Sequence, residues 1–320
     1  MLSLTLQYNG TDGELLGDVE QLQLRDVLAK EASTLQITLR NTGGRYTGAW
    51  AAVRGDVIGF SLGSAKPRSY AIDKVTVQAS PATVVWSASA RPLTTKRPKK
   101  GGSGAAPPPP GAAELSTKSS WAPVHDLTLS ALLTRVADEA GMRAVYAYGK
   151  DPALGTVSRY RESAWRLLTR QARRFGCEVN ASADILTLTG PRRAKEAIDK
   201  GEQKAIVLED KDIAQISSAQ AITPGKVRAV TVDADKGKIT LSDAEGEDGF
   251  AVLLDEPAGD PAAVLEYLRA EATEVRLSLR PREVVAGAVI EYQNERYEVR
   301  LVEYTRTGAA ETMTLTCRGI

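Results

Sequence analysis

The chain has 320 residues, of which 42% are hydrophobic and 25% charged, which is typical of a soluble globular protein with two or three domains. Its 41 basic and 40 acidic side chains leave a formal net charge of +1, so the overall charge does not favour recognition of nucleic acid or of an anionic membrane. No apolar run reaches the length of a membrane span, and Met1–Gln7 alternates like a strand, so we expect no membrane insertion, no signal peptide and a cytoplasmic origin.

Residues 1–94 are predicted to form a small β-barrel. Apolar and polar residues alternate between Leu35 and Leu39, which places one face of a strand in a core. A second alternating stretch changes phase between Ile72 and Val75, as a β-bulge or sharp bend in a small barrel requires.

Residues 95–120 contain a run of Gly, Pro and Lys that offers too little apolar surface to offset the entropy of ordering. We expect an exposed and largely disordered loop here. Its basic cluster at Lys99–Lys100 has two interpretations, a solvated run of charge or an arm that docks on an acidic partner.

The next segment, 121–190, is predicted to be a compact α/β module between two barrels. Its first helix follows Asp126 and Thr128, either of which could act as the N-cap. The predicted elements are two helices and a β-hairpin, at 129–140, 163–176 and 177–188.

A charged connector at 191–205, predicted to be helical, leads to a second β-barrel at 206–320. Within this segment, two apolar runs flank a turn at 233–237 and indicate a hairpin. Pro261 opens a predicted helix near 261–273, because its fixed φ suits the first helical position.

The second barrel is predicted because its sequence repeats the first. Glu31–Arg40 returns as Glu271–Arg280 with every apolar position in phase, and Gly55–Ile58 returns as Gly287–Ile290. Positions that match at identical spacing are Tyr70 with Tyr297, Ile72 with Val299, Val75 with Val302, Val77 with Tyr304, Trp86 with Met313, Ala88 with Leu315 and Ala90 with Cys317. Two half-buried strands can resemble one another by chance, but two blocks in the same order favour an internal repeat. The predicted fold class is α+β, mainly β, with two similar small β-barrels and an inserted α/β module.

The sequence singles out no catalytic, cofactor-binding or metal site. His125 is the single histidine, and its neighbour Asp126 cannot orient an imidazole as a triad carboxylate does. Cys177 and Cys317 lie among apolar neighbours and are interpreted as small core residues, with a disulfide between them the less favoured alternative. No spacing among the 40 acidic residues indicates a glycosidase pair. We therefore expect no enzyme activity and no cofactor.

Several segments share a pattern with one known family. Thr128–Met142 has the spacing of a helix that ends at glycine, and Tyr160–Gly176 contains Glu-Ser-x-Trp-x-Leu-Leu in a second helix that ends in glycine. Ala32–Asn41, followed by Trp50, fits the start of the same family. In these features the chain resembles the phage late control protein D family. These are baseplate hub proteins of contractile phage tails, related to the hub part of type six secretion spike proteins.

The resemblance spans most of the chain and is weakest over 233–260. Arg91–Arg97 looks like a family segment that runs almost directly into a Ser-x-x-Trp motif, represented here by Ser119–Trp121. In this chain the Pro-rich loop separates the two, which leaves the role of the loop open.

The resemblance implies a structural hub. Such hubs are similar to trimers in which two barrels per chain form a pseudo-sixfold ring around a central channel. Three chains with two alike barrels present six alike surfaces, which can join a hexameric tail tube to a trimeric spike. The implied partners are two further copies, the tail tube protein and the central spike protein, with the tape measure protein and other baseplate proteins as further candidates. The implied location is the virion tail baseplate, assembled in the host cytoplasm, with residues 1–94 facing the tube.

Two other classes of protein are alternatives. A tail-associated cell-wall hydrolase would need a catalytic set, and a murein-degradation assay separates it from a hub. A carbohydrate-binding double barrel would need clustered exposed aromatic side chains, whereas aromatic residues make up 5% of this chain.

Overall fold

The computed structural model describes residues 3–12, 14–28, 33–48, 50–64, 68–79, 82–89, 118–140, 142–182, 185–221, 223–233, 238–241, 245–246, 250–254 and 257–320. The predicted loop lies outside the described residues up to residue 117, whereas Lys118 already belongs to a strand. The predicted turn after Asp233 also lies outside them.

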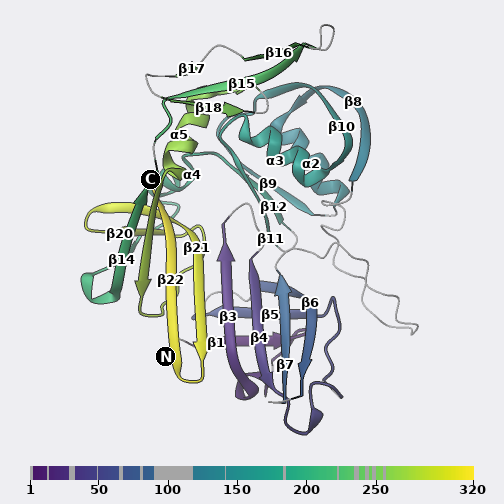
Figure 1. The fold of residues 1–320 in the computed structure, drawn as a ribbon, viewed down its shortest axis with the longest axis vertical. Coiled ribbons are helices and arrows are strands. Elements are labelled where there is room, and N and C mark those ends of the chain that lie inside the picture. The colour runs from purple at the N-terminus through teal and green to yellow at the C-terminus, as the bar shows by residue number, and fades with distance from the viewer. Residues whose placement is uncertain are drawn as a thin grey trace.

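One long sheet combines strands from both ends of the chain (Figure 1). Its order is β14-β19-β22-β21-β3-β4-β7-β6-β5-β1-β2, with β20 beside β21 and β13 beside β20. The N-terminal strands are β1 (Leu4–Tyr8), β2 (Thr11–Asp12), β3 (Val19–Val27), β4 (Thr34–Arg40), β5 (Val57–Leu62), β6 (Arg68–Gln78) and β7 (Thr83–Ser89). The C-terminal strands are β13 (Ile206–Val207), β14 (Ile213–Gln220), β19 (Thr273–Leu279), β20 (Val289–Tyr292), β21 (Glu295–Thr307) and β22 (Ala310–Gly319). Short 3₁₀ turns lie at Glu14–Asp18, Thr42–Gly44 and Asp210–Asp212.

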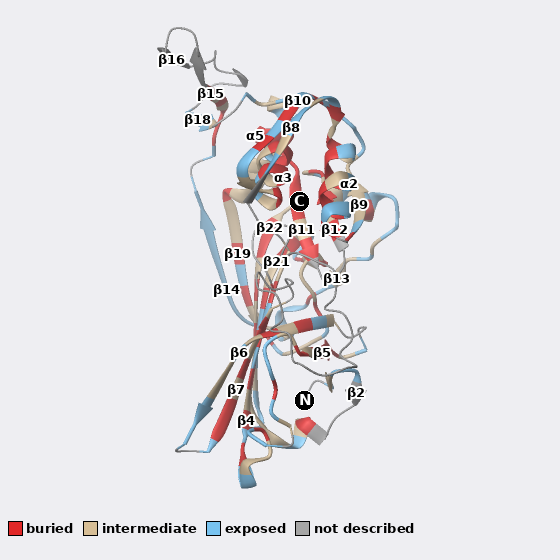
Figure 2. Ribbon diagram, turned by 90° about the vertical axis from the view of Figure 1, so that its right-hand side faces the viewer, coloured by how far each residue is buried: buried red, intermediate tan, exposed pale blue. Residues whose placement is uncertain are grey.

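Alternation along these strands produces the core. Leu22 in β3 and Ile37 in β4 are fully buried, and polar residues flank them. A fully buried side chain of this size contributes about 1.5–3 kcal/mol relative to an exposed one. The same core cluster includes Trp86 of β7 and Tyr304 of β21, so both halves of the sheet share it. Figure 2 shows that buried residues lie along β7, β22 and α3.

The two halves pair their strands in the same order, β4-β7-β6-β5 in one and β19-β22-β21-β20 in the other. The register of β6 against β7 shifts between Ile72 and Lys74. The register of β21 against β22 shifts between Val299 and Leu301. The two phase slips predicted from the sequence are therefore confirmed as β-bulges at matching places.

Glycines at the start of the second repeat block have the same backbone role. Gly55 donates its N–H to the carbonyl of Ile72, and Gly287 donates to that of Val299, both at 2.8 Å. Their φ angles are 93° and 89°, in the region that favours glycine. This requirement explains why the sequence repeats Gly ahead of each Val-Ile pair.

The register changes the predicted equivalences between β7 and β22. Ala88 lies opposite Ile72, and Cys317 lies opposite Val299, so Cys317 and not Leu315 matches Ala88, whereas Ala90 lies outside the described residues. Val75 lies opposite Trp86, whereas its counterpart Val302 lies opposite Leu315, so Leu315 and not Met313 matches Trp86. The hairpin of the second half is two residues longer. A shift of two residues keeps the same side chains on the buried face, so alternation alone cannot detect it.

The described strands do not close either half into a barrel, so the two-barrel repeat stays a prediction. The architecture is α+β and mainly β. Among the described residues, no helix is long and apolar enough to cross a lipid bilayer.

The α/β module lies above the N-terminal strands in Figure 1 and has a core of its own. Its elements are β8 (Lys118–Thr128), α2 (Leu129–Glu139), β9 (Arg143–Ala147), β10 (Ala153–Ser163), α3 (Ala164–Arg173), β11 (Glu178–Ser182) and β12 (Ile185–Thr189). β8 pairs with β10, and β12 pairs with both β9 and β11. Thr128, and not Asp126, caps α2 by accepting from the N–H of Ala131 at 3.3 Å.

The remaining elements lie beside the module. They are α4 (Arg193–Asp199), β15 (Lys226–Asp233), β16 (Lys238–Leu241), β17 (Glu245–Gly246), β18 (Ala251–Leu254) and α5 (Pro261–Glu271). The predicted hairpin of β15 and β16 is confirmed. β15 also pairs with β17 and β18 in a sheet separate from the long one, within the segment 206–320 that is predicted to contain the second barrel.

Candidate functional site

The residues considered for catalysis from the sequence are not assembled into a reactive set. His125 lies in β8, and its Nδ1 is 2.9 Å from the hydroxyl of Thr156 in β10. A triad imidazole is instead oriented by a carboxylate.

The two cysteines are free and buried, in different cores. Burial raises the pKa of each thiol, Cys177 and Cys317, to about 12. A thiol with such a pKa is protonated at neutral pH and is a poor nucleophile or metal ligand. Among the described residues no group of three His, Cys, Asp or Glu side chains is placed to hold a metal ion.

Two open grooves flank α5. The first, of about 610 Å³, lies against α3 and is lined by four arginines and one carboxylate, Glu271. The second, of about 870 Å³, contains the carboxylates of Glu196, Asp260 and Glu266. Glu266 binds Arg192, with 2.7 Å between Oε2 and Nε. A glycosidase acid needs a raised pKa, whereas the hydrogen bond from Lys150 holds the pKa of Asp260 below its usual range.

Unfolding measurements at acid pH test whether Lys150 holds Asp260 as a charged carboxylate. Its carboxylate accepts from Lys150 Nζ at 2.7 Å and caps α5 through the N–H of Ala263 at 3.0 Å. Because the folded-state pKa is lowered, the stabilisation is present above the ordinary carboxyl pKa and is lost as pH falls through the folded value. We expect Asp260→Ala to cost about 1 kcal/mol at neutral pH.

The matched variant is Asp260→Asn, which keeps a capping oxygen but cannot ionise. Urea unfolding at a series of pH values should give a difference between wild type and Asp260→Asn that shrinks on acidification. A difference that grows as pH falls would contradict the charged pair with Lys150.

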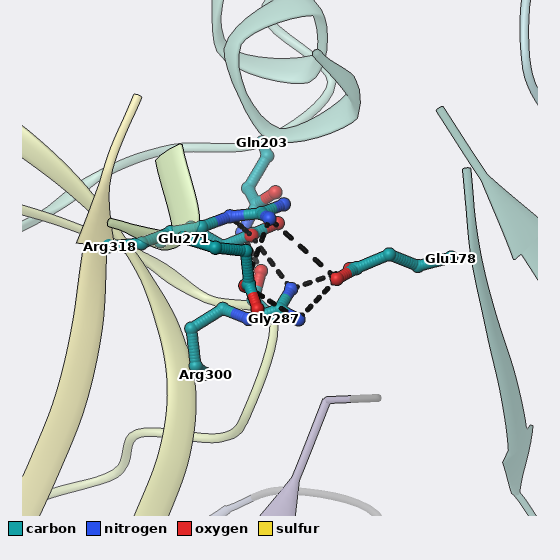
Figure 3. Close-up of polar contacts among 7 residues, drawn as sticks. Glu178, Gln203, Glu271, Gly287, Arg300 and Arg318 are labelled. Atoms are coloured by element: carbon teal, nitrogen blue, oxygen red, sulfur yellow. Dashed lines mark hydrogen bonds and ion pairs between the residues drawn. The ribbon is translucent and has the colours of Figure 1, made fainter. Parts of the chain in front are cut away.

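A buried cluster of ion pairs joins the module to the C-terminal half of the sheet (Figure 3). Arg300 Nη1 lies 2.6 Å from Glu178 Oε2 and 3.2 Å from Glu298 Oε2. Arg318 Nε lies 2.8 Å from Glu298 Oε2, and its Nη1 lies 3.5 Å from Glu271 Oε1. Four separate elements therefore meet through these five side chains: β11, α5, β21 and β22.

The bulge in β21 explains how Arg300 reaches this cluster. Arg300 is the extra residue between Val299 and Leu301, where the register shifts. A bulge redirects a side chain out of the regular alternation. The guanidinium can therefore meet Glu178, which comes from the module.

The cluster contains three carboxylates and two guanidinium groups, mostly shielded from water. Side chains of Glu178 and Arg318 are each 7% exposed, and that of Arg300 is 13% exposed. Burial works to lower the pKa of Arg300, but the hydrogen bond and charge of Glu178, with the other carboxylates, raise it overall. The guanidinium of Arg300 therefore stays charged, and the ion pairs of the cluster join the module to the sheet.

Close backbone packing supports the same joint. The N–H of Gly259 donates to the carbonyl of Arg174 at 2.8 Å, and Arg174 Nε donates to the carbonyl of Pro257 at 3.0 Å. Gly176 has φ 65°, and a Cβ there would lie 2.4 Å from the carbonyl oxygen of Ala263. The end of α3 and the start of α5 thus approach as closely as a glycine permits.

A second joint connects the two halves of the long sheet. β3 pairs antiparallel with β21, and Asp26 at the end of β3 is buried. Its carboxylate binds Arg68 Nη1 at 2.6 Å and accepts from the hydroxyl of Ser33 at 2.9 Å. It also accepts from the N–H of Ala286, in the other half, at 2.9 Å. One buried carboxylate therefore bonds to both halves.

These joints were not predicted from the sequence. Charged residues in strands are usually solvated, so Glu298 and Arg318 gave no signal of burial. The one indication was the break in alternation around Arg300. That break was interpreted only as a bulge.

The whole chain resembles solved structures of tail proteins. A 43 kDa tail protein of prophage MuSo2 from Shewanella oneidensis has a TM-score of 0.65 at 11% identity, with 99% of this chain and 98% of that chain covered. A tail protein from Neisseria meningitidis MC58 has a TM-score of 0.64 at 12% identity, covering 99% and 96%. The fold is that of these tail proteins.

A third similar structure is the E. coli c3393 protein, a component of the type VI secretion system with structural similarity to T4 bacteriophage tail proteins gp27 and gp5. It has a TM-score of 0.62 at 12% identity, covering 98% of this chain and 76% of that chain. The sequence matches no protein-family model and no curated protein. The resemblance to tail hub proteins noted in the sequence is thus confirmed for the tail-protein fold.

Proposed function

We propose that the chain is a structural, non-enzymatic hub of the baseplate of a phage tail or a related contractile injection machine. The observation that carries the proposal is the whole-length likeness to tail proteins and to a type VI secretion component. The ion-paired joints support it further, because a hub that bears load between tube and spike needs its parts held in fixed positions.

The proposed assembly is a trimer around a central channel. Each chain contributes two halves with the same strand order, each proposed to be one copy of a barrel repeat. Three chains then offer six alike surfaces to a hexameric tail tube and three to a trimeric spike. The proposed segments are those of the sequence analysis: barrels at 1–94 and 206–320, with the module at 121–190 between them.

The proposed partners are the tail tube protein on the side of the first barrel and the central spike protein on the other side. The tape measure protein and other baseplate proteins are further candidates. The proposed location is the virion tail baseplate, after assembly in the host cytoplasm.

Mass measurement tests the copy number. We expect three times the chain mass of 34.2 kDa, either for the purified protein or after addition of tube or spike protein, since an interface of barrel sides can be too weak to hold alone. Native mass spectrometry of both samples gives the stoichiometry. A dimer under both conditions would contradict the hub.

A further inference from the structure

Among the described residues of the long sheet, β14 and the later part of β6 each have one edge without a strand partner, as do the two-residue strands β2 and β13. β14 pairs with β19 alone, and residues 214–220 along it are exposed. β6 pairs with β5 over Arg68–Ala71, so its later residues, 74–78, have a strand on one side only, that of β7. The free backbone donors and acceptors of an edge strand are a template for another strand.

The chain already contains one completed junction of matching strands. β3 pairs with β4 as β14 pairs with β19, and β21 pairs with β22 as β6 pairs with β7. β3 and β21 are joined antiparallel over 21–27 and 301–307. The open edges of β14 and β6 are therefore the counterparts of the two strands that meet inside the chain.

Exposed apolar side chains mark both open edges. Val77 in β6 is 56% exposed, and Ile216 in β14 is 47% exposed. Their counterparts at the completed junction, Tyr304 and Leu22, are both 0% exposed. The cross-strand registers place all four in the core-facing phase of their strands. A strand added to either edge would bury the side chain that is now exposed.

The sequence of β14 lacks the residues that usually keep an edge strand from pairing with another strand. It reads Ile-Ala-Gln-Ile-Ser-Ser-Ala-Gln, without a charged residue or a proline. Charges and prolines are the usual means by which an edge strand avoids pairing. Its one register shift lies at its start, between Ile213 and Gln215.

We infer that β14 of one copy adds antiparallel to β6 of the next copy, as β3 adds to β21 within the chain. Transfer of the internal register places Ser218 opposite Val77, and Gln220 opposite Val75, of the neighbouring copy. We assign the added strand to a second copy because β14 corresponds to β3 and β6 corresponds to β21, and β3 and β21 already pair within the chain. The contact is head-to-tail, and its closure into a ring of three rests on the proposed function.

Cysteine cross-linking of purified protein tests this register. Protein carrying Ser218→Cys is mixed with protein carrying Val77→Cys, and the mixture is treated with an oxidant or a short thiol cross-linker. Side chains opposite each other on paired strands lie within reach of such a link. We expect a covalent dimer from the mixture and none from either variant alone, and a covalent trimer from one chain carrying both changes.

The matched control replaces Ser218→Cys by Ser217→Cys, which points to the opposite face of the strand. It should give no cross-link with Val77→Cys. A second measurement uses Val77→Lys, which places a charge where an apolar contact is expected. We expect self-association at least about tenfold weaker, with an unchanged melting temperature for the monomer. Val207→Lys, at a residue 62% exposed in β13, should change neither.

The outcomes separate two failures. If trimers form without the Ser218 to Val77 cross-link, or if Ser217→Cys cross-links equally well, the edge pairing is wrong and the hub stands. If neither cross-link nor trimer forms in the free protein or with tube and spike proteins present, both the pairing and the hub are wrong.

Discussion

Replacing Glu178 by glutamine is expected to lower the free energy of unfolding by about 1.5–3 kcal/mol, because Arg300 loses the carboxylate that accepts hydrogen bonds from both Nη1 and Nη2. Glu178 reaches from β11 of the module to Arg300 and Arg318 of the sheet. The glutamine has nearly the same size, so the loss reports charge and hydrogen bonding with little change in packing. Urea unfolding of both proteins measures it.

Glu274→Gln is the matched control for this change. Glu274 Oε1 lies 2.7 Å from Arg276 Nε, but the two side chains are 41% and 62% exposed. Exposed pairs contribute at most about 1 kcal/mol, so this variant should unfold almost as wild type does. Equal losses in the two variants would show that the buried cluster does not hold the module in place.

Replacing Gly176 by alanine is expected to cost about 3 kcal/mol, from two sources. The φ of 65° is unfavourable for alanine by about 1–2 kcal/mol. In addition, the new Cβ would lie 2.4 Å from the carbonyl oxygen of Ala263, and backbone must move to relieve the contact. We expect a lower denaturant midpoint and weaker protection from hydrogen exchange at the start of α5.

Comparison with Gly201→Ala separates the cost of the backbone conformation from the cost of the close contact. Gly201 has a similar φ of 71°, but nothing lies within 4 Å of a Cβ built there. It should therefore lose only the backbone part, about 1–2 kcal/mol. If Gly176→Ala costs no more than Gly201→Ala, the close approach of α3 and α5 is not a constraint on the fold.

Local patterns predicted the elements that depend on local physics. The helices beginning at Leu129 and Pro261, and both bulges, follow from periodicity, caps and phase. β14 was not predicted, because Ile-Ala-Gln-Ile-Ser-Ser-Ala-Gln lacks alternation and is held as a strand by pairing with β19. Pairing partners are set by tertiary contacts, which one strand's sequence does not contain.

The contacts of the two joints could not be predicted from the sequence for the same reason. Glu178 and Arg318 are 140 positions apart by residue number, and their meeting depends on how the module packs against the sheet. The longer hairpin of the second half moves the residue that matches Trp86 from Met313 to Leu315. This shift of two residues leaves every apolar position in phase, so alternation in the sequence does not reveal it. The resemblance to tail hub proteins supplied the fold, which residue patterns alone predicted only as repeated β-structure.

An electron microscopy map of the assembled tail end, detailed enough to separate strands, tests the hub most directly. The expected map has three copies of the chain in a ring around the channel, with six alike halves against the tube and the trimeric spike on the opposite side. Copies placed away from the tail axis, or in a number other than three around it, would contradict the hub.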